Sequence, residues 1–209
     1  MSDTEPKDLP QIYLVTPPVI DTYTFPVLLA QCLDAVEVSC IRLALATTDE
    51  DELSRAADAC RDVAYERDIA IVVDRHVQLV DRLGLDGVHL PDGGRSVGQM
   101  RKDMGEDVIV GAYCGASRHD GLNAAEAGAD YVSFGPVTSS LLGDGSLAEE
   151  ELFQWWSDMI EVPVVAEGGL DAAMIASLSD KVDFISLGAE VWDAEDPVET
   201  FKALAAARG

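Results

Sequence analysis

The chain has 209 residues, 48% of them hydrophobic, which suits one substantial α/β domain. Its formal net charge of -25 excludes a general nucleic-acid-binding protein and a protein that binds anionic membranes, because both need a basic surface. The first ten residues, MSDTEPKDLP, lack the apolar core of a signal peptide, and no apolar run is long enough to span a membrane. We therefore expect a cytoplasmic protein.

Short apolar runs alternate along the chain with longer amphipathic stretches. Eight runs are predicted to be strands: 12–15, 38–43, 70–73, 87–90, 108–112, 131–134, 162–166 and 184–187. The stretches that follow them are predicted helices: 25–35, 49–67, 76–83, 97–104, 121–127, 147–159, 171–178 and 197–207. Polar residues that precede helices are expected as N-caps, namely Thr48, Ser96, Ser146 and Asp196.

Apolar strands that alternate with helices indicate a parallel sheet buried on both faces. Eight such units in this length predict a single (β/α)8 TIM barrel over residues 11–209, after a short N-terminal tail of residues 1–10. An open doubly wound sheet is the alternative. The sequence LVTPPV follows the first strand in place of G-x-G-x-x-G, which argues against a dinucleotide-binding domain.

The four cysteines show no metal-binding or disulfide spacing. Cys32, Cys40, Cys60 and Cys114 are scattered without a C-x-x-C pair, so they are expected to be reduced core residues. Cys114 follows an apolar strand and could instead face a pocket.

Small residues follow the last two predicted strands. The active site of such a barrel lies at the C-terminal ends of its strands, and phosphate is often held there by backbone amides after strands 7 and 8. Gly168, Gly169, Gly188 and Ala189 are therefore candidate phosphate-binding residues, with AEVW at 189–192 as a short helix. The alternative is that the glycines only permit a tight turn.

Five segments carry a family resemblance over nearly the whole chain. They are YLVTP at 13–17, GVHL at 87–90, GADYVSFGPV at 128–137, VPVVAEGGL at 162–170 and DFISLGAEVW at 183–192. Together they resemble the thiamine phosphate synthase and thiazole tautomerase superfamily. The resemblance implies a TIM barrel that joins a hydroxymethylpyrimidine diphosphate to a thiazole phosphate, with Mg²⁺ assisting the leaving diphosphate and loop amides holding the thiazole phosphate.

Several positions depart from the family's diphosphate and metal motifs. The family motif Q-L-R-x-K supplies two cations, but Ala44 and Ala46 stand at those positions. Arg75 and Gly94 replace the two carboxylates that hold Mg²⁺ in the family, so no metal site is predicted. Asp74 and Asp92 lie one or two positions away and could form a shifted pair. The loop GPVTSSLLGDGSL at 135–147 lacks the family's lysine.

The polar residues at the strand ends remain as candidate site residues. The candidate catalytic residues are Asp74, Arg75, His76 and Glu167, and the candidate substrate-binding residues are Arg42, Asp92, Tyr113, Ser139 and Ser140. A carboxylate beside a bound phosphate is costly unless it is paired or protonated, and Arg42 or Arg75 could pair with Glu167. The alternative role for Glu167 is a salt bridge that closes a barrel without a ligand.

The sequence thus predicts a thiamine phosphate synthase-like protein of thiamine biosynthesis that binds a small phosphorylated heteroaromatic ligand at the barrel mouth. The replaced residues argue against full synthase activity. A non-catalytic ligand-binding or partner barrel is one alternative. A tautomerase-like isomerase is another, because proton transfer needs one acid or base, such as His76 or His119, and no metal. His89 is expected to belong to the scaffold, and a homo-oligomer is compatible with the sequence.

Overall fold

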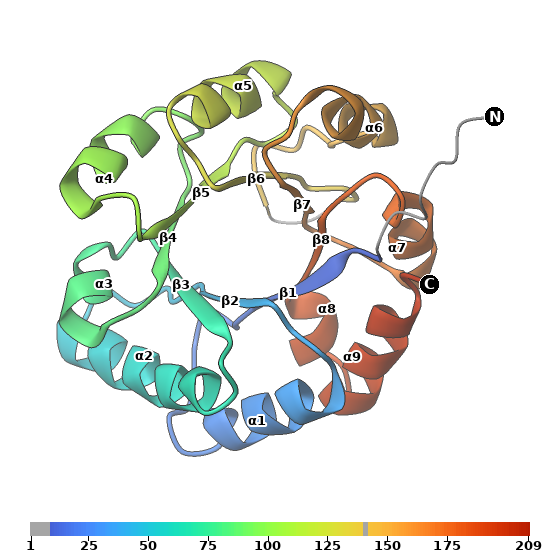
Figure 1. Ribbon diagram of the computed structural model, residues 1–209. Helices are drawn as coiled ribbons and strands as arrows, with labels where there is room; N and C mark the ends of the chain where they lie inside the picture. Colours follow the sequence, from blue (N-terminus) through green and yellow to red (C-terminus); the bar gives the residue numbers. More distant parts are fainter. Residues whose placement is uncertain (1–8, 140–141) are drawn as a thin grey trace.

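The computed structural model describes residues 9–139 and 142–209, and they form a closed barrel of eight parallel strands (Figure 1). Neighbouring strands pair in chain order, and β8 closes on β1. The strands are β1 (Gln11–Val15), β2 (Cys40–Leu43), β3 (Ala70–Asp74), β4 (Gly87–Leu90), β5 (Ile109–Tyr113), β6 (Tyr131–Phe134), β7 (Val164–Ala166) and β8 (Phe184–Leu187). The predicted single TIM barrel is confirmed.

The helices form a ring outside the strands (Figure 1). They are α1 (Phe25–Ala35), α2 (Glu50–Tyr65), α3 (Gln78–Leu83), α4 (Val97–Met104), α5 (Arg118–Glu126), α6 (Glu150–Met159), α7 (Ala172–Leu178), α8 (Ala189–Trp192) and α9 (Pro197–Ala206). The short helix α8 lies where AEVW was expected to form one. No helix in the described part of the chain is both long and apolar enough to cross a membrane.

Some helix starts differ from the predicted ones. Helix α6 begins after Glu149 and not after Ser146, because the amide of Ala148 donates to the carbonyl of Pro136 at 2.8 Å and keeps the loop extended. Helix α2 is capped by Asp49 and not by Thr48, since the Asp49 carboxylate accepts from the amide of Glu52. Asp196 caps α9 as predicted.

Two separate apolar clusters stabilise the barrel. The larger one lies between the strands and the helices and holds the outward-facing strand residues, such as Ile12, Ile41 and Val132. The smaller one fills the barrel interior with Tyr13, Cys40, Val72, Tyr131 and Val165. Alternate residues of a strand point to opposite faces, so the next inward-facing positions along the strands lie one layer nearer the C-terminal mouth.

That last interior layer is polar. It contains Arg42, His89, Ser133, Glu167 and Ser186, all of which are buried. A barrel interior is a packed core, so polar groups there need partners inside it. The site is built from these groups.

Candidate functional site

An ion pair crosses the inside of the barrel mouth between β2 and the end of β7. Arg42 Nη2 lies 2.6 Å from Glu167 Oε2, and the two residues are only 6% and 2% exposed. Ser133 Oγ donates to the other Glu167 oxygen at 2.6 Å. Burial opposes the Arg42 charge, but Glu167, Tyr13 and Asp74 together, with Glu167 the largest of the three, outweigh it and hold the pKa of Arg42 well above its usual range. The guanidinium is therefore charged, and its charge is compensated within the barrel.

A chain of hydrogen bonds leads from Arg42 towards the apolar interior. Arg42 Nη1 lies 2.7 Å from His89 Nε2, and a guanidinium can only donate, so Nε2 accepts and the ring proton resides on Nδ1. Nδ1 then donates to the Tyr131 hydroxyl at 2.9 Å, and this hydroxyl shares a hydrogen bond of 2.6 Å with the Tyr13 hydroxyl. Burial, together with the nearby Arg42 charge, lowers the pKa of His89 well below its usual value. His89 is a neutral link in the scaffold, as the sequence indicated.

Asp74 and Arg75 lie beside this network at the end of β3. Asp74 Oδ1 is 3.9 Å from Arg42 Nε, and both atoms are buried without a hydrogen-bond partner. Burial raises the pKa of Asp74, against the lowering effect of Arg42. Arg75 is exposed and forms no ion pair with any described residue. Its φ of 62° is the left-handed conformation, which costs a residue with a side chain about 1–3 kcal/mol and occurs most often at functional sites.

These side chains line a cavity of about 380 Å³ at the centre of the mouth. Its walls include Arg42, Asp74, Arg75, His89, Tyr113 and Glu167. The Tyr113 hydroxyl donates to the carbonyl of Gly135 at 2.7 Å, and burial raises its pKa to about 12, so the hydroxyl keeps its proton. The cavity therefore offers the partly exposed Asp74 carboxyl and the exposed Arg75 guanidinium to the polar edge of a small ligand.

The loops after β7 and β8 line a second cavity of about 220 Å³. All four predicted phosphate-binding residues, Gly168, Gly169, Gly188 and Ala189, lie in its wall, together with Arg42, Glu167 and Glu190. Gly168 and Gly169 have φ values of 87° and 76°, which favour glycine. A Cβ on Gly169 would lie 2.1 Å from Thr138 Oγ1, so a side chain does not fit there.

The amides of these loops already hold a carboxylate of the chain. Glu190 Oε1 accepts from the amides of Gly169 at 2.8 Å and Leu170 at 3.2 Å, and Oε2 accepts from the amide of Gly188 at 3.0 Å. We call these three amides the amide cradle. Of the predicted residues, Gly169 and Gly188 contribute amides to it, and Leu170 and Glu190 were not predicted. The prediction that phosphate binds here stays a prediction.

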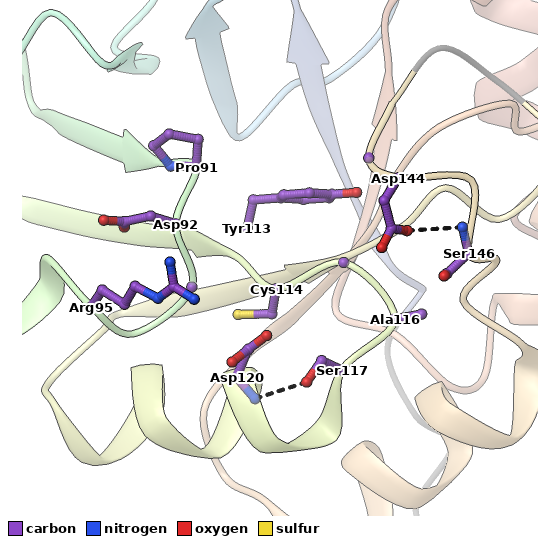
Figure 2. A pocket seen from close by; sticks show the side chains of 13 residues that line it. Pro91, Asp92, Arg95, Tyr113, Cys114, Ala116, Ser117, Asp120, Asp144 and Ser146 are labelled. Atoms are coloured by element: carbon purple, nitrogen blue, oxygen red, sulfur yellow. Dashed lines mark hydrogen bonds between the residues drawn. The ribbon is translucent and has the colours of Figure 1, made fainter.

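A third cavity, of about 540 Å³, lies towards β4 and β5 (Figure 2). Asp92, Arg95 and Asp120 line it together with the buried thiol of Cys114, and Tyr113 separates it from the central cavity by lining both. Burial raises the pKa of Cys114 to about 12, so this thiol is inert although it faces a cavity. All four cysteines are free and buried, as expected.

The structure brings some of the predicted site residues together and leaves others apart. Arg42, Asp74, Arg75, Tyr113 and Glu167 share the central cavity, whereas Asp92 lines the third one. Other predicted residues are not in the wall of any of these three cavities: His76 and the exposed Ser139. Ser140 lies outside the described residues. The candidate base His119 is exposed on α5, where it contacts Asn123.

The residues that are present do not fit the Mg²⁺ that the resemblance implies. No group of three or more His, Cys, Asp or Glu side chains within residues 9–139 and 142–209 is placed to hold a metal ion. Asp74 and Asp92 line different cavities, and Asp92 Oδ2 accepts from Ser96. Mg²⁺ takes six oxygen ligands in near-ideal octahedral geometry, which two separated carboxylates do not provide.

Comparison with known proteins places this chain in a family. The family model described as thiamine monophosphate synthase matches residues 12–191. The chain belongs to the thiamine monophosphate synthase family. A thiamine-phosphate synthase of Rhodospirillum centenum is 35% identical over 185 residues, which cover 88% of this chain and 89% of the relative. One of Erythrobacter litoralis is 34% identical over 193 residues, with coverages of 89% and 90%.

The solved structures include a protein with the same barrel. The thiamine phosphate pyrophosphorylase of Pyrococcus furiosus superimposes with a TM-score of 0.83 over 95% of both chains, at 22% identity. This similarity shows a shared fold. At the barrel mouth of this chain, Arg42 and Glu167 form an ion pair, and the carboxylate of Glu190 occupies the amide cradle.

Proposed function

We propose that this chain is a thiamine phosphate synthase-like protein of thiamine biosynthesis that binds a small heteroaromatic phosphate, such as the thiazole phosphate, at the C-terminal mouth of the barrel. One observation carries the proposal: the loops after β7 and β8 present three convergent amides that hold an anionic group at 2.8–3.2 Å. A phosphate oxygen is an acceptor of the same charge and reach. The heterocycle would lie over the central cavity, beside Asp74 and Tyr113.

The charges at the mouth argue against the coupling reaction of the family. A departing diphosphate accumulates negative charge, so its transition state needs cations or a metal ion close by. Arg42 is the buried cation at this mouth, and Glu167 compensates its charge at 2.6 Å. Ala44 and Ala46 supply none, and two exposed cations, Arg75 and Arg95, line different cavities. We therefore propose ligand binding without efficient synthase turnover.

Titration calorimetry with two matched ligands tests this proposal. The thiazole phosphate should bind saturably and more tightly than the corresponding thiazole alcohol, and its addition should shift the backbone amide resonances of Gly169, Leu170 and Gly188. Incubation with the pyrimidine diphosphate, the thiazole phosphate and Mg²⁺ should produce no thiamine phosphate at the rate near 10 per second that is typical of enzymes. Equal affinity for phosphate and alcohol, or turnover at that rate, would contradict the proposal.

A second function, an isomerase, is favoured by Asp74. Its Oδ1 is buried without a hydrogen-bond partner, it lines the central cavity, and burial raises its pKa towards the range useful for general acid–base catalysis. The test is proton exchange between D2O and the bound thiazole phosphate, followed by NMR. Exchange above the rate without protein, reduced at least tenfold in Asp74→Asn, would support an isomerase. Exchange that is unchanged in Asp74→Asn would remove Asp74 as the acid or base.

A further inference from the structure

Glu190 stands out at the mouth because its carboxylate lies where a ligand's anionic group would bind. Its two oxygens accept hydrogen bonds from all three amides of the cradle, at 2.8 Å from Gly169, 3.2 Å from Leu170 and 3.0 Å from Gly188. The bond to Gly188 is local in the sequence. The other two bonds reach the loop after β7, where Gly169 and Leu170 lie 21 and 20 residues before Glu190. The carboxylate thus spans the cradle from the β8 loop to the β7 loop.

The shape of the cradle indicates a ligand site and not only a packed turn. Gly169, Gly188 and Glu190 border the cavity of about 220 Å³. Arg42 and Glu167 belong to the same cavity wall. A Cβ on Gly169 would lie 2.1 Å from Thr138 Oγ1 and one on Gly168 would lie 3.0 Å from Pro136, so the packing of this loop as well as its positive φ values favour glycine. A loop that only needed closing could use one hydrogen bond, whereas three amides here converge on one anionic group.

The charges around the cradle disfavour the presence of a phosphate and the Glu190 carboxylate at the same time. The charged residues that line the cavity are Arg42, Glu167 and Glu190, and Arg42 is already paired with Glu167 at 2.6 Å. A phosphate that entered beside Glu190 would meet a second carboxylate with no free cation between them. Like charges at such short range repel strongly in a partly desolvated site. Phosphate and the Glu190 carboxylate therefore exclude each other.

We propose that Glu190 is a specificity-determining residue that competes with the ligand's phosphate for the amide cradle. This inference rests on the proposed function above and adds a built-in competitor to it. A ligand binds only to molecules whose cradle is open, so its apparent dissociation constant equals the intrinsic constant divided by the open fraction. With three hydrogen bonds holding the carboxylate, we expect an open fraction below one tenth.

The experiment compares the wild type with Glu190→Ala, Glu190→Gln and the control Glu195→Ala. Glu195 is exposed, lies five positions further along the chain, and its substitution changes the net charge by the same amount. Calorimetry with inorganic phosphate should show at least tenfold tighter binding to Glu190→Ala than to the wild type. Glu190→Gln should lie between them, because its single carbonyl oxygen can still accept from one loop but its amino group faces an N–H donor. Glu195→Ala should bind phosphate as the wild type does.

A second measurement guards against a variant that has lost its fold. Phosphate should raise the melting temperature of Glu190→Ala more than that of the wild type, and should shift the amide resonances of Gly169, Leu170 and Gly188 in that variant. Equal phosphate affinity in Glu190→Ala and the wild type would overturn the inference and leave the proposed function standing. An unfolded Glu190→Ala together with an unchanged affinity in Glu190→Gln would make Glu190 a structural clamp and would also overturn it. Failure of both the wild type and the variants to bind inorganic phosphate or the thiazole phosphate would refute the proposed function itself.

Discussion

The ion pair between Arg42 and Glu167 gives a sharp prediction about stability. Replacing Glu167 with alanine removes the acceptor of two 2.6 Å hydrogen bonds, one from Arg42 and one from Ser133. It also leaves the Arg42 guanidinium, which is 6% exposed, with the more distant Asp74 carboxyl, 3.9 Å from Nε, as its remaining ion-pair partner among the described residues. Breaking a buried pair in this way costs about 3–5 kcal/mol of unfolding free energy. In a domain of this size that corresponds to a fall in melting temperature of about 10 °C.

The double variant Arg42→Met/Glu167→Met separates the pair from its two members. It removes both charges of the pair and fills the space with side chains of similar length, and the acid that loses its Arg42 partner, Asp74, has a side chain that is 24% exposed. We expect it to be more stable than either single methionine variant, with a coupling energy of about 2 kcal/mol or more. The polar atoms of His89 and Ser133 that face the pair lose their partners, so the double variant should still be less stable than the wild type.

Urea unfolding followed by circular dichroism measures these differences, with an exposed ion pair as the control. Lys202 and Glu199 lie 2.8 Å apart on α9, but 47% and 65% of their side chains are exposed. Glu199→Met should therefore change the unfolding midpoint little, and 1 M salt should not reduce the effect of Glu167→Ala. A loss below about 1 kcal/mol for Glu167→Ala, or additive effects of the two single substitutions, would refute the buried-pair reasoning.

Three other properties of the chain follow from its buried groups. Burial raises the pKa of Asp74 in the folded state, so this carboxyl contributes stability that is fully present below its unfolded pKa of about 3.9 and is lost as the pH rises through its folded pKa. The gain in unfolding free energy of Asp74→Asn over the wild type should therefore grow between pH 4 and pH 7, whereas the exposed control Asp107→Asn should show no such trend. Millimolar Mg²⁺ should not raise the melting temperature. A specific site with Mg²⁺ at ten times its dissociation constant would add about 1.4 kcal/mol to the free energy of unfolding. A rise in melting temperature that Asp74→Asn or Asp92→Asn abolishes would show that the two carboxylates bind the metal. Burial raises the pKa of the four thiols to about 11 or 12, so at pH 8 they should react with a thiol reagent only after unfolding, and fast labelling of the native chain would contradict this.

The barrel itself could be predicted from the sequence because each strand is buried on both faces. Such strands appear as continuous apolar runs, and eight of them were found close to their observed positions. The starts of some helices could not be predicted, because tertiary contacts fix them. Helix α3 begins at Gln78 and not at His76, since the chain first makes a tight turn in which the amide of His76 donates to the carbonyl of Asp74 at 2.6 Å.

The site was predictable to the extent that strand ends meet at one mouth. This rule brought Arg42, Asp74 and Glu167 together, and the need to pair Glu167 pointed to Arg42 or Arg75, of which Arg42 forms the pair. It could not identify Tyr131 as part of the hydrogen-bonded chain, although Gly111 on the neighbouring strand was a signal. A Cβ at Gly111 would lie 2.0 Å from Tyr131 Cζ, so the missing side chain makes room for the ring.

Glu190 was missed for a different reason. In a chain with a net charge of -25, an acidic residue after a strand is indistinguishable from a solvated surface group. Its role depends on the backbone of the loop after β7, where Gly168 and Gly169 adopt positive φ values and the amides of Gly169 and Leu170 donate to the Glu190 carboxylate. No side-chain pattern in the sequence records that direction. Only the conformation of the loop shows which group accepts the hydrogen bonds of its amides.

The two anion sites that the family resemblance implies would differ in what they require from the protein, so our proposal of one site does not require the other. Diphosphate binding depends on cationic side chains and a metal, which substitutions such as those at Ala44, Ala46 and Arg75 remove one at a time. A phosphate held by backbone amides depends on loop conformation, which the glycines after β7 preserve whatever the charge of the surface. A single carboxylate such as Glu190 can then compete for that site without changing the fold. Our proposal therefore predicts that replacing Glu190 alone changes the affinity for a phosphate without changing the fold.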